Sequence, residues 1–142
     1  MLSGSSMQTI PVSCAIILRD HHILAVKRSE SMPLAGFWEF PGGKVEKGES
    51  PPESLVREIQ EELQVTIQIK KELPHSKHSY TEGKLIQLIP FLAEISAGEV
   101  HLVEHEEVRW LGAKELFQLN WAAADVPIVQ FLHDNWSELV AF

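Results

Sequence analysis

The chain has 142 residues, of which 44% are hydrophobic, and this length and composition fit one domain with a substantial core. The formal net charge of −8 at pH 7 disfavours nucleic-acid polymers and anionic membranes as partners, because both attract basic surfaces. No apolar run approaches the length of a membrane-spanning helix. The same negative charge would repel a polyphosphate substrate unless divalent cations were bound at the site first.

Residues 1–6 precede a second methionine, Met7. They are too short and polar for a signal peptide and are interpreted as a cloning remnant, so a single domain is predicted over residues 7–142. The one cysteine, Cys14, lies in an apolar segment and has no partner for an internal disulfide. A reducing cytoplasm is therefore the expected location, with Cys14 as a small buried side chain.

The hydrophobic pattern predicts strands interspersed with a few helices. A continuous apolar run at residues 12–18 predicts a buried strand, and a turn at 20–22 returns the chain as a hairpin. Pro90 is expected at an edge or a bulge of a long strand, because proline has no N–H to donate. The other strands are predicted at residues 23–26, 65–69, 84–95 and 108–111, and helices at 51–63, 113–117 and 125–136.

A glycine-rich turn at residues 42–49 leads into the most informative helix of the chain. Ser50 and Glu53 have the spacing of a capping box, and Pro51 suits the first helical position. Apolar residues at helical spacing predict that one side of this helix faces a core. Three carboxylates share the neighbouring face because they stand at positions i, i+3 and i+4: Glu58, Glu61 and Glu62.

Like charges at this spacing repel one another, each pair by roughly 0.2–0.5 kcal/mol in an exposed helix. Clustered carboxylates suit Mg²⁺ or Mn²⁺, which are hard cations that take oxygen ligands. For the three glutamates alone, the alternative is a solvated acidic face on which Arg57 pairs with Glu61 one turn away. The glycine turn and the spacing of the whole segment favour a metal site.

The segment resembles the Nudix box, whose pattern is G-x5-E-x7-R-E-U-x-E-E-x-G-U with U an aliphatic residue. The matching residues are Gly43, Glu49, Arg57, Glu58, Ile59, Glu61, Glu62 and Val65. Gln64 stands where the family has a glycine, which predicts a strained or differently closed helix end, at a cost of roughly 1 kcal/mol. The resemblance implies an α/β (α+β) fold, the Nudix-type α/β/α sandwich with a mixed β-sheet between helices.

Further matches outside the box resemble the MutT-like branch of the Nudix hydrolase superfamily. They lie at residues 27–28, 37–43 and 122–128, and the resemblance extends from about residue 10 to 130. This branch implies a Mg²⁺-dependent nucleoside triphosphate pyrophosphohydrolase that releases a nucleoside monophosphate and diphosphate. The first expected substrate is 8-oxo-dGTP, for a sanitiser of the nucleotide pool. The alternative is a cytosine-type triphosphate, CTP or 5-methyl-dCTP.

The resemblance also implies roles for the acidic residues of the box. The expected ligands of Mg²⁺, with Mn²⁺ as a substitute, are the Gly42 carbonyl, Glu58, Glu61, Glu62 and Glu104. The expected catalytic residues are Glu58, Glu61, Arg57 and Glu104. Glu58 would add a metal ligand or deprotonate the attacking water, Glu104 would hold a further metal or share the role of base, and Arg57 would orient a glutamate of the helix.

Asp125 lies in the segment that resembles the base-reading loop of the branch. The alternative is a helix N-cap, because Asp125 stands two residues before Pro127. An ionised Asp125 only accepts hydrogen bonds, so pairing with the O6 acceptor of an oxidised guanine would require protonation in a desolvated pocket. The other expected substrate-binding residues are Arg28, which would contact phosphate or base, and Trp38 and Phe40, which would stack on a base.

A non-catalytic nucleotide-binding Nudix module is the alternative from another functional class. The MutT-like terminal domain of adenine glycosylases shares the entry to the box but lacks the helix carboxylates, so the glutamates retained here favour an enzyme. The sequence leaves open whether the protein is a monomer or a homodimer. Tyr80 is expected to pack in the core. Exposed positions are expected for the histidines that lack zinc-site spacing, namely His75, His78, His101 and His105.

Overall fold

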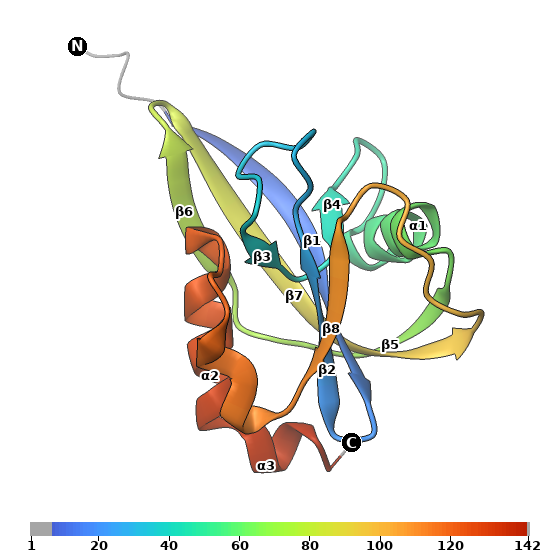
Figure 1. Ribbon diagram of the computed structural model, residues 1–142. Helices are drawn as coiled ribbons and strands as arrows, with labels where there is room; N and C mark the ends of the chain where they lie inside the picture. The colour runs from blue at the N-terminus through green and yellow to red at the C-terminus, as the bar shows by residue number, and fades with distance from the viewer. Residues whose placement is uncertain (1–6, 142) are drawn as a thin grey trace.

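A computed structural model describes residues 7–141 (Figure 1). The prediction made for residues 1–6 concerns residues outside this range. Within the described range, no helix is both long enough and apolar enough to cross a bilayer. The elements are β1 (Gln8–Arg19), β2 (His22–Lys27), β3 (Trp38–Glu39), β4 (Gly42–Lys44), α1 (Pro51–Leu63), β5 (Thr66–Glu72), β6 (Ser76–Thr81), β7 (Lys84–Ala97), β8 (Glu107–Leu111), the 3₁₀ helices η2 (Ala113–Gln118) and η3 (Ala123–Asp125), α2 (Val126–Asp134) and α3 (Trp136–Leu139).

The sheet is built around β1. One edge of β1 pairs in parallel with β7 from residue 8 to residue 17. The other edge is divided between two antiparallel partners, β4 beside residues 12–14 and β2 beside residues 18–19. The remaining pairs are antiparallel, so the sheet is mixed, with the order β3-β2-β1-β7-β5 along its main path. Because β2 leaves this edge free beside residues 12–14, β4 can pair there with the central strand β1. β4 contains Gly43, the first residue of the motif that resembles the Nudix box.

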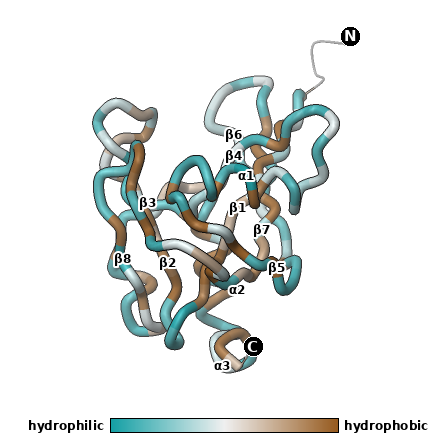
Figure 2. Tube along the Cα trace, turned by 90° about the vertical axis from the view of Figure 1, so that its right-hand side faces the viewer, coloured by the Kyte–Doolittle hydropathy of each residue, from teal (hydrophilic) through white to brown (hydrophobic). Residues whose placement is uncertain are grey.

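Side chains of β1 alternate between two cores, which explains its continuous apolar run. Cys14 and Ile16 belong to the cluster that includes α2, whereas Ala15 and Ile17 belong to the cluster that includes α1. Brown, hydrophobic segments gather in the sheet, and the peripheral loops are mostly teal (Figure 2). Helix α1 and the pair α2 and α3 therefore cover opposite faces (Figure 1), and the predicted α/β/α sandwich is confirmed.

β7 lies inside the sheet, so Pro90 does not mark an edge. Pro90 is paired with Cys14 of β1 on one side. On the other side β6 pairs with residues 84–88 of β7, and β5 pairs with residues 91–97. Pro90 therefore faces the change of partner, where its carbonyl accepts a hydrogen bond from the Leu73 N–H at 2.9 Å. This break in the ladder removes the need for the donor that proline lacks.

The first turn of α1 is closed by the predicted capping box. The Ser50 hydroxyl accepts a hydrogen bond from the Glu53 N–H, and the Glu53 carboxylate accepts one from the Ser50 N–H. The helix buries the side that its periodicity predicts, with the buried residues Ser54, Leu55, Ile59 and Leu63. The carboxylate face is thus held in a fixed rotation about the helix axis, toward β4 and the segment at residues 98–106.

The last turn of α1 ends at Gln64, which has the left-handed conformation with φ 60° and ψ 34°. Its N–H donates to the Gln60 carbonyl at 3.1 Å. The carbonyls of Glu62 and Leu63 accept from the N–H groups of Val103 and His101, at 3.3 and 2.9 Å. A glutamine therefore takes the conformation that the family pattern assigns to glycine, and the segment after β7 satisfies the helix end.

The C-terminal helices differ from the prediction of one helix at residues 125–136. α2 ends at Asp134 and α3 begins at Trp136. Between them Asn135 leaves the helical conformation, with φ −119° and ψ 20°, and both its N–H and its side-chain amide donate to the Phe131 carbonyl, at 3.1 and 2.9 Å. The predicted helix at 113–117 is the 3₁₀ helix η2. Both segments pack on the face of the sheet opposite α1.

The left-handed conformation of Gln64 predicts the effect of restoring glycine. Gln64→Gly should raise the free energy of unfolding by about 0.5–1 kcal/mol, because glycine adopts this conformation without the Cβ penalty. Urea denaturation measures the change. Gln64→Ala is the matched control, since it keeps the Cβ, and it should give no gain. A loss of stability in the glycine variant would show that the Gln64 side chain supports the helix end.

Candidate active site

Two adjoining cavities collect most of the residues singled out in the sequence. The first, of about 370 Å³, is lined by Arg28, Glu39, Phe40, Glu58, Glu62 and Asp125 together with Val12, Ser13, Cys14, Met32, Gly42, Gly43, Lys44, Glu46 and Leu88. The second, of about 440 Å³, is lined by Glu58, Glu61, Glu62, Val103 and Glu104. Glu58 and Glu62 belong to both. The structure therefore brings the four glutamates expected to bind metal next to the residue expected to read the base.

β4 approaches its neighbours so closely that a Cβ does not fit at its first two positions. A Cβ on Gly42 would lie 2.0 Å from the Ser13 carbonyl oxygen, and one on Gly43 would lie 2.3 Å from the Glu58 carboxyl carbon. The Gly42 N–H also donates to Glu62 Oε1 at 3.3 Å. The glycine pair thus lets two carboxylates of α1 rest against β4 at the cavity wall.

Arg57 binds three glutamates. Its Nε and Nη2 donate to the two oxygens of Glu49 at 2.7 and 2.9 Å, a bidentate pair. Its Nη1 donates to Glu58 at 3.0 Å and to Glu61 at 3.1 Å. The hydrogen bonds from Arg57 lower the pKa of Glu49, and those to Glu49 raise the pKa of the guanidinium further above its usual value. Arg57 therefore contacts glutamates of the box and lies outside the lining of both cavities.

Glu62 is a largely buried carboxylate with other carboxylates close to it. Burial raises the pKa of Glu62 to about 8, and the charges of Glu39 and Glu58 add to this rise. A divalent cation would favour the ionised form and relieve the repulsion. Within residues 7–141 no three acidic, histidine or cysteine side chains already surround one point, and Arg57 holds two of the glutamates. The donor set of carboxylate oxygens is the one that a hard divalent cation takes.

Asp125 is buried at the wall of the first cavity, with 5% of its surface exposed. Asp125 stands at the N-cap position of α2, but its side chain makes no cap hydrogen bond, so the prediction that its side chain caps the helix is wrong. Instead, Asp125 Oδ2 accepts a hydrogen bond from the Phe40 N–H at 3.0 Å. Burial raises the pKa of Asp125 to about 8, against the opposing effect of that bond. The carboxyl is therefore mainly protonated at neutral pH and carries a hydrogen that it can donate.

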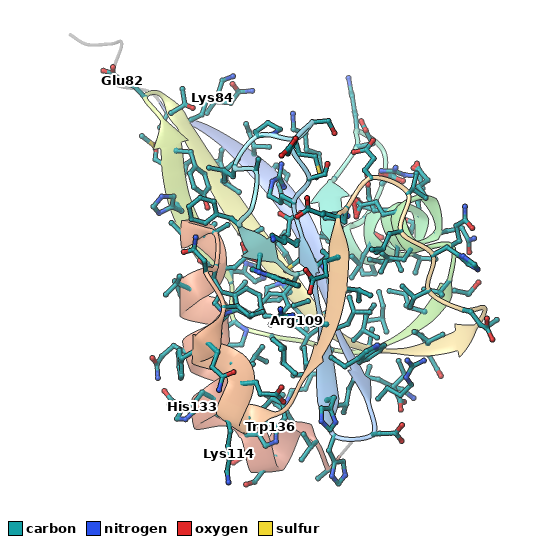
Figure 3. All side chains as sticks on the ribbon, viewed as in Figure 1. Glu82, Lys84, Arg109, Lys114, His133 and Trp136 are labelled. Carbon is teal, nitrogen blue, oxygen red and sulfur yellow. The ribbon has the colours of Figure 1, made fainter. Side chains whose placement is uncertain are left out.

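The three other expected substrate-binding residues are placed differently. Phe40 lines the first cavity and packs against Trp121 with ring centroids 4.7 Å apart. Trp38 is 5% exposed and lies in the core, outside the cavity lining. Arg109, which Figure 3 labels on β8, places its guanidinium 5.2 Å from the Trp38 ring centroid. Arg28 lines the cavity, but its Nη1 is paired with a carboxylate of β3 rather than free for phosphate.

That carboxylate belongs to Glu39, a residue that the sequence gave no reason to assign to the site. Glu39 Oε1 accepts from Arg28 Nη1 at 2.7 Å, and Glu39 Oε2 bonds with His105 Nε2 at 2.8 Å. The expectation that His105 is exposed is wrong, because its side chain is 1% exposed. His105 follows Glu104 directly, so this bond fastens the loop that carries Glu104 to β3. Only folding brings residues 39 and 105 together.

Comparisons with known proteins identify the family. The model of the NUDIX domain matches residues 7–132. The CTP pyrophosphohydrolase of Escherichia coli strain K12 is 36% identical over 124 residues, which are 87% of this chain and 91% of that protein. The 8-oxo-dGTP diphosphatase of the same strain is 28% identical over 124 residues, 87% of this chain and 95% of that protein.

Solved structures agree with this match. The solution structure of the E. coli ORF135 protein has a TM-score of 0.80 at 32% identity and covers 93% of this chain and 94% of its own. The crystal structure of a MutT Nudix hydrolase from Burkholderia pseudomallei has a TM-score of 0.77 at 31% identity. The match covers 87% of this chain and 97% of that protein. The chain belongs to the Nudix family and is a MutT-like Nudix hydrolase. Nudix hydrolases generally use a divalent metal ion, and the donor set fits one.

The two glycines of β4 predict different outcomes for the same substitution. Gly43→Ala should leave folding nearly intact and lower kcat about 100-fold, because its Cβ displaces only the end of the Glu58 side chain. Gly42→Ala should lower the melting temperature instead, because its Cβ meets the backbone of Ser13. Steady-state kinetics and thermal melts measure both effects. Unchanged turnover in Gly43→Ala would show that the position of Glu58 does not matter for the reaction.

Proposed function

We propose that the protein is a Mg²⁺-dependent nucleoside triphosphate pyrophosphohydrolase that yields a nucleoside monophosphate and diphosphate. One observation carries the proposal. Four glutamates line two adjoining cavities, and the wall of the first cavity also contains the buried Asp125, whose pKa is raised to about 8. A triphosphate bound with its phosphates at the glutamates would place its base toward Asp125. The negatively charged lining explains why the phosphates need a cation to approach.

The metal would be held by the Gly42 carbonyl, Glu58, Glu61, Glu62 and Glu104, with Mn²⁺ as a substitute for Mg²⁺. When bound, the cation neutralises phosphate oxygens and so favours displacement of a phosphate leaving group. The participation of Glu104 is supported by two contacts of its loop: the bond of His105 with Glu39 fixes the loop to β3, and the Val103 N–H donates to the Glu62 carbonyl of α1 at 3.3 Å. Burial and neighbouring carboxylates raise the pKa of Glu62, and a cation bound beside it would favour the ionised form, so that its proton would leave to solvent.

The residues of the chain then supply the proton transfer and the orientation. Water attacks a phosphorus atom, one P–O bond of the anhydride breaks, and the oxygen of the leaving group keeps the electron pair. We assign the proton of the water to Glu58, with Glu104 as the alternative acceptor. Arg57 keeps the carboxylates of Glu58 and Glu61 in place through its Nη1 and is itself oriented by Glu49. Arg57 is thus a positioning residue.

We assign the base pocket to an oxidised purine, with 8-oxo-dGTP as the first substrate. A neutral Asp125 can donate its hydrogen to the O6 acceptor of the base, because its Oδ2 is already engaged with Phe40. The ring of Phe40 offers a stacking surface at the cavity. Trp38 stays in the proposal only as support behind Phe40, and Arg28 as a residue that contacts substrate if Glu39 releases it.

A cytosine-type triphosphate, CTP or 5-methyl-dCTP, is the second candidate. It is supported by the 36% identity to the CTP pyrophosphohydrolase of Escherichia coli. The N4 amino group of cytosine would donate to Asp125, which accepts a hydrogen bond in either protonation state. We further propose a cytoplasmic enzyme without nucleic-acid polymer or membrane partners, as a monomer or a homodimer.

A panel of triphosphates tests the proposed function. Purified protein is assayed with 8-oxo-dGTP, dGTP, CTP, 5-methyl-dCTP and dATP, with and without Mg²⁺, and diphosphate release is measured. We expect release only with the cation and fastest with an oxidised purine. Glu62→Gln should lower kcat at least about 100-fold, on the scale of losing a principal electrostatic group. Phosphate release without diphosphate, or full turnover in the Glu62→Gln variant, would contradict the proposal.

The raised pKa of Asp125 predicts how stability depends on pH. The carboxyl binds a proton in the folded protein up to about pH 8 but ionises near its ordinary value of 3.8 when the chain unfolds. The contribution of Asp125 to the free energy of unfolding therefore falls as pH rises from about 4 to about 8. Above pH 8 this contribution no longer changes with pH. Asp125→Asn removes this titration. Urea denaturation from pH 5.5 to 9.5 should show the wild type losing stability relative to the variant up to about pH 8.

The same titration distinguishes the two candidate bases. If Asp125 donates to an oxidised guanine, kcat/KM for 8-oxo-dGTP should fall above about pH 8, and Asp125→Asn, which keeps a donor, should remove this fall. If it accepts from cytosine N4, the wild-type to variant ratio for CTP should not change with pH. Comparing the ratio at each pH cancels the effects of pH on the metal site. A ratio for 8-oxo-dGTP that is flat across pH 6–9.5 would refute donation by Asp125.

A further inference from the structure

The residue before Asp125, Ala124, is held at both of its backbone polar groups by side chains of β6. The N–H of Ala124 donates to Tyr80 Oη at 2.7 Å, and the carbonyl of Ala124 accepts from Ser76 Oγ at 2.8 Å. Ala124 and Ser76 are 4% and 5% exposed, so water does not readily replace the second bond. These two bonds tie η3, which carries Asp125, to a strand about 45 residues earlier in the chain.

Two side chains of β6 reach both backbone polar groups of Ala124. The pairing of β6 with β7 is irregular between His78 and Thr81, and the hydroxyls of Ser76 and Tyr80 nevertheless both bond the Ala124 backbone. β6 pairs with β7 at the side of the sheet where α2 begins, and the tip of their hairpin, marked by Glu82 and Lys84, extends past α2 (Figures 1 and 3). β6 therefore lies beside η3.

Tyr80 is not a core residue, contrary to expectation, because 42% of its surface is exposed. Burial of its polar end raises its pKa, and the hydrogen bond from the Ala124 N–H opposes this effect. The edge of the His78 ring lies against it, with centroids 4.5 Å apart. The ring thus contributes little to the core, while its hydroxyl is fixed at a backbone donor beside Asp125.

Asp125 is held from the opposite direction as well. Its Oδ2 accepts from the Phe40 N–H, which belongs to the segment between β3 and β4. The backbone of Asp125 is fixed through Ala124 by β6, and its carboxyl is fixed by Phe40. Hydrogen bonds weaken steeply as their distance and angle depart from the optimum. The bonds that hold the backbone and the carboxyl of Asp125 therefore decide how strongly this carboxyl can hydrogen-bond to a base.

We propose that Ser76 and Tyr80 are positioning residues for base selectivity, which act by fixing the backbone of Ala124 and through it the Asp125 carboxyl. This inference rests on the proposed function, in which Asp125 reads the base. Neither hydroxyl lines the cavities that contain the glutamates. The two residues therefore influence the binding of the preferred base and leave the hydrolysis of the phosphates unaffected.

Tyr80→Phe is the main test, because it removes only the hydroxyl of a half-exposed ring and leaves the ring in place. We expect kcat/KM for the preferred triphosphate to fall about 3- to 10-fold, the scale of one net hydrogen bond, and mainly through KM. For the least-preferred triphosphate of the panel, kcat/KM should stay within about twofold. Ser76→Ala should act in the same direction. Lys77→Ala, at an exposed neighbouring position that points to the other face of β6, is the matched control and should change neither value.

Amide hydrogen exchange at Ala124, followed by NMR, gives a readout independent of activity. Exchange should be faster in Tyr80→Phe than in the wild type and unchanged in Lys77→Ala. Faster exchange with unaltered selectivity would overturn the proposal, because the peptide would then be held without any effect on the base. An equal loss for all triphosphates would also overturn it, since that result describes general destabilisation.

Asp125→Ala separates failure of this inference from failure of the proposed function. If that variant keeps the selectivity of the wild type, Asp125 does not read the base, and the assignment of the base pocket fails first. If Asp125→Ala loses selectivity while Tyr80→Phe and Ser76→Ala keep it, base reading stands and the positioning role of β6 is refuted. Loss of selectivity in all three variants, with the lysine control intact, supports both.

Discussion

The site depends on holding carboxylates together against their mutual repulsion. Burial and neighbouring glutamates raise the pKa of Glu62 to about 8, so the native fold itself makes this group hard to ionise. The opposing force is the packing of α1, whose Leu55, Ile59 and Leu63 are fully buried. Burying each such side chain contributes about 1.5–3 kcal/mol. Packing therefore prevails, and the crowded carboxylates remain available to a cation.

Glu39 connects the metal-binding and base-binding parts of the cavity. Its charge raises the pKa of both Glu62 and Asp125. Its two oxygens are held by Arg28 and His105. A partly buried ion pair loses much of its Coulomb energy to desolvation. The bonds of Glu39 therefore contribute more to holding Arg28 and the His105 loop in position than to the free energy of unfolding. Burial is the main cause of the raised pKa of Asp125, and the negative charge of Glu39 adds to it. The same charge makes a cation beside Glu62 more favourable.

The features that the sequence predicted well are those fixed by local chemistry. The capping box at Ser50 depends on neighbours three residues apart, and the carboxylate face of α1 depends on helical periodicity. Gln64 took the left-handed conformation because the turn geometry demands it whatever the residue. The C-terminal helix was predicted too long, since the chain leaves the helical conformation at Asn135, a local change that no periodicity reveals.

By itself the sequence determined the Nudix family, the mixed sandwich and the glutamates of the box, because these follow from residue types at fixed spacing. The tertiary structure alone decided the protonation of Asp125, since the pKa of a carboxyl depends on burial that only packing creates. It also decided the contacts of Glu39 with His105 and of Ser76 with Ala124, which join residues 66 and 48 positions apart. Hydrogen bonds over such separations have no periodic signature, because they depend on how strands and helices meet in space.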